Sequence, residues 1–123
     1  MTKLEELLQN VRDEIGADLV ESDIVGLDGF SVAGLSTDPN LNREAVSARF
    51  ALAMKLALTV SEKLNLGELQ DNLVTADNYI TLCRSLGDGS YFWILTVKKE
   101  ATLGMVRLTM NDYAPRLWEA IPR

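Results

Sequence analysis

The chain has 123 residues, enough to bury one substantial core, and its 47% apolar and 24% charged residues are typical of a globular protein. Its net charge of −6 argues against binding of nucleic acid or anionic lipid, because both are bound through clustered lysine and arginine. We therefore expect a soluble protein with a single domain over residues 1–123, which neither binds nucleic acid nor inserts into a membrane.

Cys83 is the only cysteine, so an internal disulfide is impossible. The first residues are amphipathic and acidic, unlike the charged and then apolar pattern of a signal peptide. The longest apolar run, Phe50 to Val60, is interrupted by Lys55 and is shorter than the ~20 residues of a membrane-spanning helix. These features predict a cytoplasmic location.

The N-terminal third predicts a helix and then a β-hairpin. Thr2 and Glu5 have the spacing of a capping box, and apolar residues then recur at helical spacing until Gly16, a residue type that ends helices. From Leu19 the pattern shortens to that of strands, and Asp28-Gly29 between two apolar stretches favours a type I′ turn. The residues from Ser36 to Asn42 predict a loop.

The segment from Arg43 to Leu64 predicts a long helix with too much apolar surface for one subunit. Glu44, Lys55 and Glu62 share one narrow stripe, and alanines and larger apolar residues occupy most of the rest. A helix that covers one sheet face needs an apolar arc of only ~100° or somewhat more. We expect a second helix to cover the surplus, and the alanines would allow it to approach closely.

The C-terminal half predicts three strands and a helix. Turn-forming residues separate the strand-like runs Glu68 to Ala76, Tyr79 to Leu86 and Ser90 to Val97, of which the first is the most polar and is expected at an edge. Thr102 to Ile121 predicts a helix that Pro115 kinks or opens, although Gly104 to Leu108 alone is also compatible with a strand. The predicted class is α/β (α+β), with a five-stranded sheet between helices in the order α-β-β-α-β-β-β-α.

The residue types available argue against catalysis. The absence of histidine excludes a Ser-His-Asp triad, a Cys-His pair and a typical zinc site. Cys83 lies among apolar residues of a predicted strand and is interpreted as a structural thiol. No phosphate-binding glycine motif is present. We assign no catalytic residue, cofactor or metal, and we interpret a loose acidic group as a solvated face rather than a cation site: Asp13, Glu14, Asp18, Glu21 and Asp23.

The element order, the Asp28-Gly29 hairpin, the alanine-rich helix and the stretch from Ala101 to Leu108 together resemble the Roadblock/LC7 family, which includes dynein light chains and bacterial MglB-type regulators. The last stretch, ATLGMVRL, is similar to the family's N-L-G-x-x-R pattern, with Thr102 in place of the asparagine. The resemblance implies a profilin-like layered fold and a dimer in which the two long helices pack together and the two middle strands pair edge to edge. It also implies binding to a Ras-like small GTPase without an arginine finger, so no such role is assigned to Arg43, Arg49 or Arg84.

The leading hypothesis is therefore a non-catalytic homodimeric regulator or scaffold for a small GTPase. A charge placed at Met54 or Leu58 is expected to dissociate the dimer. The alternative is a ligand-sensing module of the profilin, PAS or GAF type, which would need a sizeable closed pocket. An enzyme with a Ser-Lys pair or aspartic acids has no motif to support it. The expected interface residues are Ser47, Phe50, Ala51, Met54, Leu58, Ser61, Leu69, Asp71 and Leu73.

Overall fold

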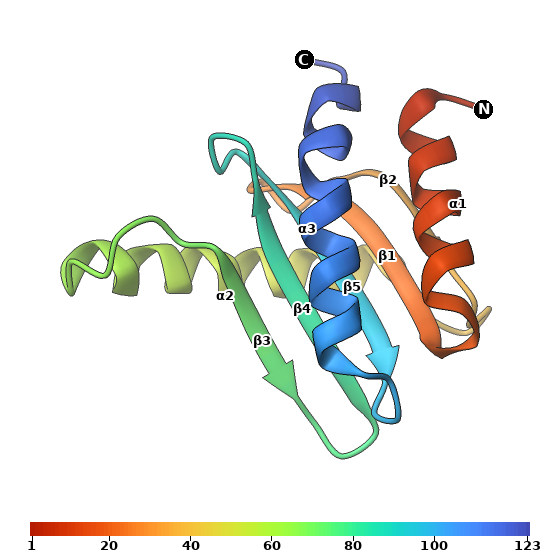
Figure 1. The fold of residues 1–123 in the computed structure, drawn as a ribbon. Coiled ribbons are helices and arrows are strands. Elements are labelled where there is room, and N and C mark those ends of the chain that lie inside the picture. Colours follow the sequence, from red (N-terminus) through yellow and green to blue (C-terminus); the bar gives the residue numbers. More distant parts are fainter.

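The computed structural model describes residues 1–123 and places a five-stranded antiparallel sheet between one helix and a pair of helices (Figure 1). The predicted element order and the α+β class are confirmed. The helices are α1 (Lys3–Ile15), α2 (Arg43–Lys63) and α3 (Leu103–Ala120), with a 3-10 turn η1 (Gly16–Asp18) after α1. The strands are β1 (Leu19–Gly26), β2 (Ser31–Ser36), β3 (Asp71–Thr75), β4 (Tyr79–Leu86) and β5 (Tyr91–Lys98).

The strands lie in the order β2-β1-β5-β4-β3, so β5 is the central strand, β1 and β4 flank it, and β2 and β3 are the two edges. β5 is buried over most of its length, as a strand covered on both faces should be. The prediction that the run around residue 70 forms an edge strand is confirmed, although β3 is shorter than predicted. The polar residues Glu68 to Gln70 precede it outside the ladder.

α1 and α3 pack side by side on one face of the sheet and enclose the larger core (Figure 1). α1 begins at the predicted capping box, in which the Thr2 hydroxyl accepts from the Glu5 amide at 3.2 Å. It ends at Gly16, whose φ of 79° suits glycine. Trp93 is fully buried beneath these helices, and its indole N–H donates to the Ser22 hydroxyl at 2.8 Å.

The predicted hairpin joins β1 to β2, but its turn is not type I′. The Gly29 amide donates to the Gly26 carbonyl at 2.9 Å, so Leu27 and Asp28 are the central residues of the turn. A type I′ turn requires positive φ at both central residues, and neither has it; the positive φ, 91°, belongs to Gly29, which follows them. The Asp28 carboxylate accepts from the Phe30 amide at 3.1 Å.

The last element is helical throughout, which excludes the alternative of a strand from Gly104 to Leu108. α3 also continues past Pro115 to Ala120, so the proline does not open its second half. Trp118 packs on the turn between β4 and β5, as predicted, and a side chain at Gly87 would collide with its indole ring. Gly87 has a φ of 54°, so glycine suits both the backbone and the close approach.

Candidate protein-binding surface

One row of α2 faces the sheet of its own subunit. Ala51 and Met54 pack against apolar side chains of β1, β4 and β5 in the smaller of the two cores. Met54 is only 1% exposed, and Ser47 and Ser61 are buried on the same side of the helix. This row attaches α2 to the sheet.

A second row of α2 faces away from the sheet and remains uncovered. Leu52, Leu56 and Val60 are spaced four residues apart and therefore lie along one side of the helix. Their exposed fractions are 67%, 66% and 43%. The predicted surplus of apolar surface on this helix is thus present, and we refer to these three residues as the outward row.

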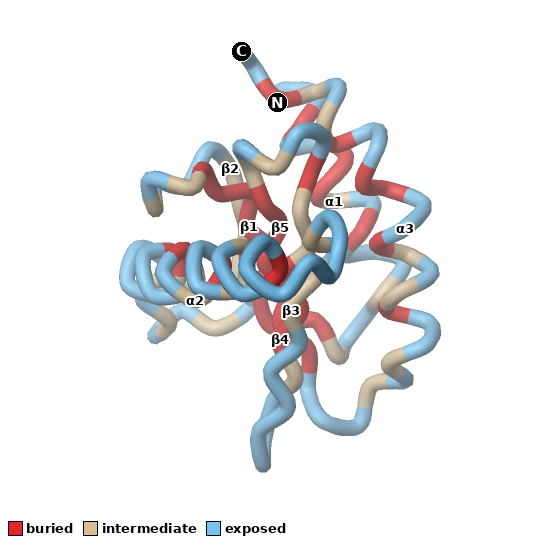
Figure 2. Tube along the Cα trace, turned by 90° about the vertical axis from the view of Figure 1, so that its left-hand side faces the viewer, coloured by how far each residue is buried: buried red, intermediate tan, exposed pale blue.

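The C-terminal end of α2 extends past the sheet. A helix of 21 residues is about 31 Å long, whereas five strands span about 19 Å. α2 starts over β1 and β2, crosses the sheet and projects beyond β3 (Figure 1), and its projecting end is exposed (Figure 2). Leu64 and Leu66, which follow this end, are both exposed. The projecting part has no sheet of its own subunit to cover.

The free edge of β3 lies at the side where α2 projects. β3 pairs only with β4, so its other edge presents unpaired backbone groups. Leu73 and Val74 point to opposite faces of this strand and are both exposed. Asp71, at the start of β3, is tied to α3 through an ion pair with Arg107 at 2.5 Å. An unpaired edge and an apolar helix end thus occur together.

The residues predicted for the interface fall into three groups. Ser47, Ala51, Met54 and Ser61 belong to the interior of the subunit, because the helix turns this side toward its own sheet. Phe50, Leu58 and Leu69 are half-buried, and Asp71 and Leu73 lie on the edge strand. The exposed apolar residues of α2 are those of the outward row, which sequence reasoning did not single out because α2 is apolar on several sides and no residue marks which side faces the sheet.

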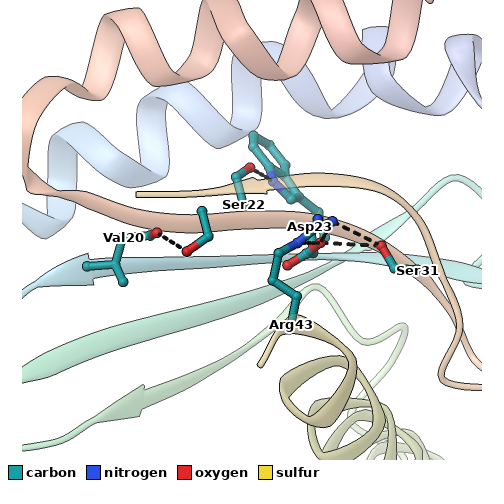
Figure 3. Close-up of polar contacts among 7 residues, drawn as sticks. Val20, Ser22, Asp23, Ser31 and Arg43 are labelled. Carbon is teal, nitrogen blue, oxygen red and sulfur yellow. Dashed lines mark hydrogen bonds and ion pairs between the residues drawn. The ribbon is translucent and has the colours of Figure 1, made fainter. Parts of the chain in front are cut away.

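A buried polar cluster lies where α2 begins. Asp23 is fully buried, and its Oδ1 accepts from the Arg43 guanidinium at 2.6 Å and from the Ser31 hydroxyl at 3.3 Å (Figure 3). Gly34 lies opposite Asp23 in the β1–β2 ladder, where a side chain would collide with both members of the ion pair. Glu21, also buried, accepts from Thr96 at 3.2 Å.

The interpretation of Glu21 and Asp23 as part of a solvated acidic face is therefore wrong. Both residues lie on β1, which is buried over its whole length because helices cover both faces of the sheet there. Burial, and then the charge of Asp23, raise the pKa of Glu21 to about 7. Residue spacing gave no sign of this, because acidic residues in a short polar run are usually exposed.

The burial and the pKa of Cys83 support its interpretation as a structural thiol. Cys83 is buried, and burial followed by the charge of Glu21 raises the pKa of its thiol to about 12. A thiol with that pKa carries almost no thiolate at neutral pH and is a poor nucleophile.

No helix combines the length and apolar character needed to cross a bilayer.

A closed ligand pocket of the kind expected for a sensor is not found among the main hollows. One hollow of about 560 Å³ lies at the end of α1 and is lined mostly by exposed residues, Arg12 and Lys98 among them. Another of about 390 Å³ lies between the end of α2 and the β4–β5 turn. Both are open to the surface, so the structure gives the ligand-sensing alternative no support.

The layered sheet with one long helix on its second face is the Roadblock/LC7 fold, and the predicted resemblance is confirmed at the level of the fold. MglB of Myxococcus xanthus superposes with a TM-score of 0.87 and 13% identity, over 97% of this chain and 94% of that chain. A structure described as MglB with a tetrameric arrangement gives 0.86 and 16%, over 97% and 88%. A Roadblock/LC7 domain from Streptomyces avermitilis gives 0.75 and 14%, over 92% and 96%.

No family model matches the sequence, and no curated protein matches it either. Identities this low establish the fold and leave function to be argued from the surface.

Proposed function

We propose that this chain is a non-catalytic, cytoplasmic homodimer of the Roadblock/LC7 type, which acts as a regulator or scaffold and binds a Ras-like small GTPase. The observation that carries the proposal is the apolar end of α2, which projects past the unpaired edge of β3. This surface suits a second copy of the chain, because a partner's sheet would lie beneath the projecting helix.

A two-fold axis beside β3 would pair the open edge of that strand and cover the apolar end of α2 at the same time. It would bring β3 next to the same strand of the partner in antiparallel orientation, and the two sheets would continue into one. The same rotation would place the projecting end of each α2 over the partner's sheet, and burial of the apolar residues on its underside, Leu58 among them, would remove apolar surface from water at about 25 cal/mol per Å². Leu73 and Val74 would then no longer be exposed at an open edge.

The regulatory role is inferred from the family resemblance and from the chemistry that the chain lacks. It has no glycine motif for nucleotide phosphates, so the nucleotide would belong to the partner. Arg43 is engaged by Asp23, and Arg84 donates to Asn111 at 2.6 Å. Both guanidinium groups are engaged within the subunit, whereas Arg49 is exposed on α2, so regulation without an inserted arginine is inferred from the family resemblance alone.

The dimer is tested by a charge on the underside of the projecting end of α2. Leu58→Asp should weaken self-association about a hundredfold or more, because Leu58 is half-buried at the end of α2 and a carboxylate there would be buried without a partner. Lys55→Glu is the matched control, since its side chain is exposed on the polar stripe of the same helix. Sedimentation velocity at micromolar concentration should give a dimer for the wild type and the control. A monomeric wild type would contradict the proposal.

Met54 cannot serve in this test, although the sequence favours it. A carboxylate at Met54 would lie in the core of its own subunit and should unfold the chain rather than separate two folded copies. Circular dichroism distinguishes the outcomes, because Leu58→Asp should keep the wild-type spectrum and Met54→Asp should lose it.

The GTPase partner is tested with purified Ras-like GTPases from the same organism. Each is loaded with GDP or with a non-hydrolysable GTP analogue and titrated with the dimer. We expect at least one to bind with an affinity that depends on the nucleotide. If none binds, the GTPase role is contradicted while the dimer stands.

A further inference from the structure

The start of α2 lies over a buried site whose charges do not balance. The side chains of Glu21 and Asp23 are 2% and 0% exposed, whereas Arg43, the first residue of α2, keeps 36% of its side chain exposed. Arg43 is the one basic group that acts on Glu21. Two carboxylates and one guanidinium leave one uncompensated negative charge, and burial of such a charge is strongly unfavourable.

Two oxygen atoms of this site also lack hydrogen-bond partners. They are Oε2 of Glu21 and Oδ2 of Asp23, one from each carboxyl group, and both are buried. The other oxygen of each group is occupied, by Thr96 and by Arg43 respectively. Asp23 acts on Glu21 as a hydrogen-bond partner as well as a charge. A proton on Glu21, donated to Asp23, would satisfy both oxygens and neutralise the site.

We infer that Glu21 and Asp23 share one proton in the folded protein, and that this proton holds the first turn of α2 against the sheet. The remaining neighbours are uncharged near neutral pH. They are Thr96 on β5 with its partner Thr81, Ser31 on β2, and Cys83 on β4, whose raised pKa keeps the thiol protonated. No other buried base is available to take the proton.

Loss of this proton would loosen the start of α2. The ordinary pKa of a glutamate is 4.5, and burial with the charge of Asp23 raises that of Glu21 to about 7. The unfolded chain therefore releases the proton at lower pH than the folded chain, so stability falls as pH rises from about 4.5 to about 7 and is level above. If α2 forms the dimer interface, as the proposed function states, pH also controls how tightly the start of that interface helix is held against the sheet. The shared proton itself does not depend on the dimer.

Carbon NMR of the carboxyl groups tests the shared proton in the wild-type chain. The side-chain carboxyl signal of Glu21 should titrate with a midpoint near 7. If the Glu21 carboxyl titrates below about pH 5, as an ordinary glutamate does, the inference is overturned. Leu58→Asp should leave this titration unchanged, so failure of the dimer and failure of the shared proton are distinguishable.

Two matched variants test the mechanical role of the proton. Glu21→Gln keeps the shape of the protonated residue and can donate to Asp23, whereas Glu44→Gln makes the same change at an exposed position in the first turn of α2. Between about pH 5 and about pH 7 the urea midpoint should fall for the wild type and for Glu44→Gln and stay level for Glu21→Gln.

Amide exchange locates the effect. Above neutral pH the first turn of α2 should lose protection in the wild type and keep it in Glu21→Gln, after correction for intrinsic exchange rates. An unchanged pH dependence in Glu21→Gln would overturn the role of the proton. If Glu21→Gln does not fold, the carboxyl titration of the wild type decides.

Discussion

The two faces of the sheet are built differently. The face under α1 and α3 is covered by two helices and encloses an apolar core of seventeen buried residues, which includes Trp93. The face under α2 is covered by one helix and has an apolar core of six, beside the buried pair Glu21 and Asp23. Most of the free energy of burial therefore comes from the first face, while the second carries both the exposed outward row and the ionisable site.

This difference separates stability from association. A helix pair can surround its core from two sides, whereas a single helix that crosses the strands and projects past them leaves apolar surface uncovered. The open face is the one on which an added charge or a second copy of the chain should change behaviour without unfolding the subunit. The predictions below test that division, from the largest expected effect to the smallest.

Trp93→Ala should be the most damaging of these substitutions. It would leave a cavity under α1 and α3 and remove the indole donor of Ser22. Loss of about 3–5 kcal/mol in the free energy of unfolding is expected. Urea denaturation measures it, and a loss below about 1 kcal/mol would mean that this core contributes far less than its burial indicates.

Gly34→Ala should weaken the α2 face without touching the larger core. The added methyl group would displace Asp23 and Arg43, because both lie where a side chain at position 34 would be placed. We expect a loss of about 1–3 kcal/mol, again by urea denaturation. Gly104→Ala is the matched control, since open space surrounds that position, and it should be neutral or slightly stabilising. Equal effects at both positions would argue against a sterically restricted ion pair.

Thr2→Ala should have the smallest effect, at the start of the helix that covers the larger core. It removes the hydroxyl that caps α1 and should lower the free energy of unfolding by about 1 kcal/mol. Thr102→Ala provides the comparison, because Thr102 occupies the same position at α3 but its side chain caps nothing. Thermal unfolding of the two variants should therefore differ, and identical melting temperatures would contradict the capping role.

Local signals in the sequence predicted most of the fold. The capping box at Thr2, the helix stop at Gly16 and the hairpin turn before Phe30 depend on residues close together in the chain, and all three were found. The type of the turn was missed because the turn is centred one residue earlier, on Leu27 and Asp28, and only Gly29 after it has positive φ. The strand order was not readable, since pairing joins residues far apart in the chain.

The sequence by itself determined that α2 carries more apolar surface than one sheet needs, because composition and period fix the width of a helix's apolar arc. Only the tertiary structure decided how that helix is rotated, which places Met54 inside and Leu56 outside. It also decided that Glu21 and Asp23 are buried, because β1 lies between β2 and β5 and the start of α2 packs over it. The rotation of α2 and the burial of Glu21 and Asp23 both depend on which elements pack together, and segments far apart in the sequence determine that packing.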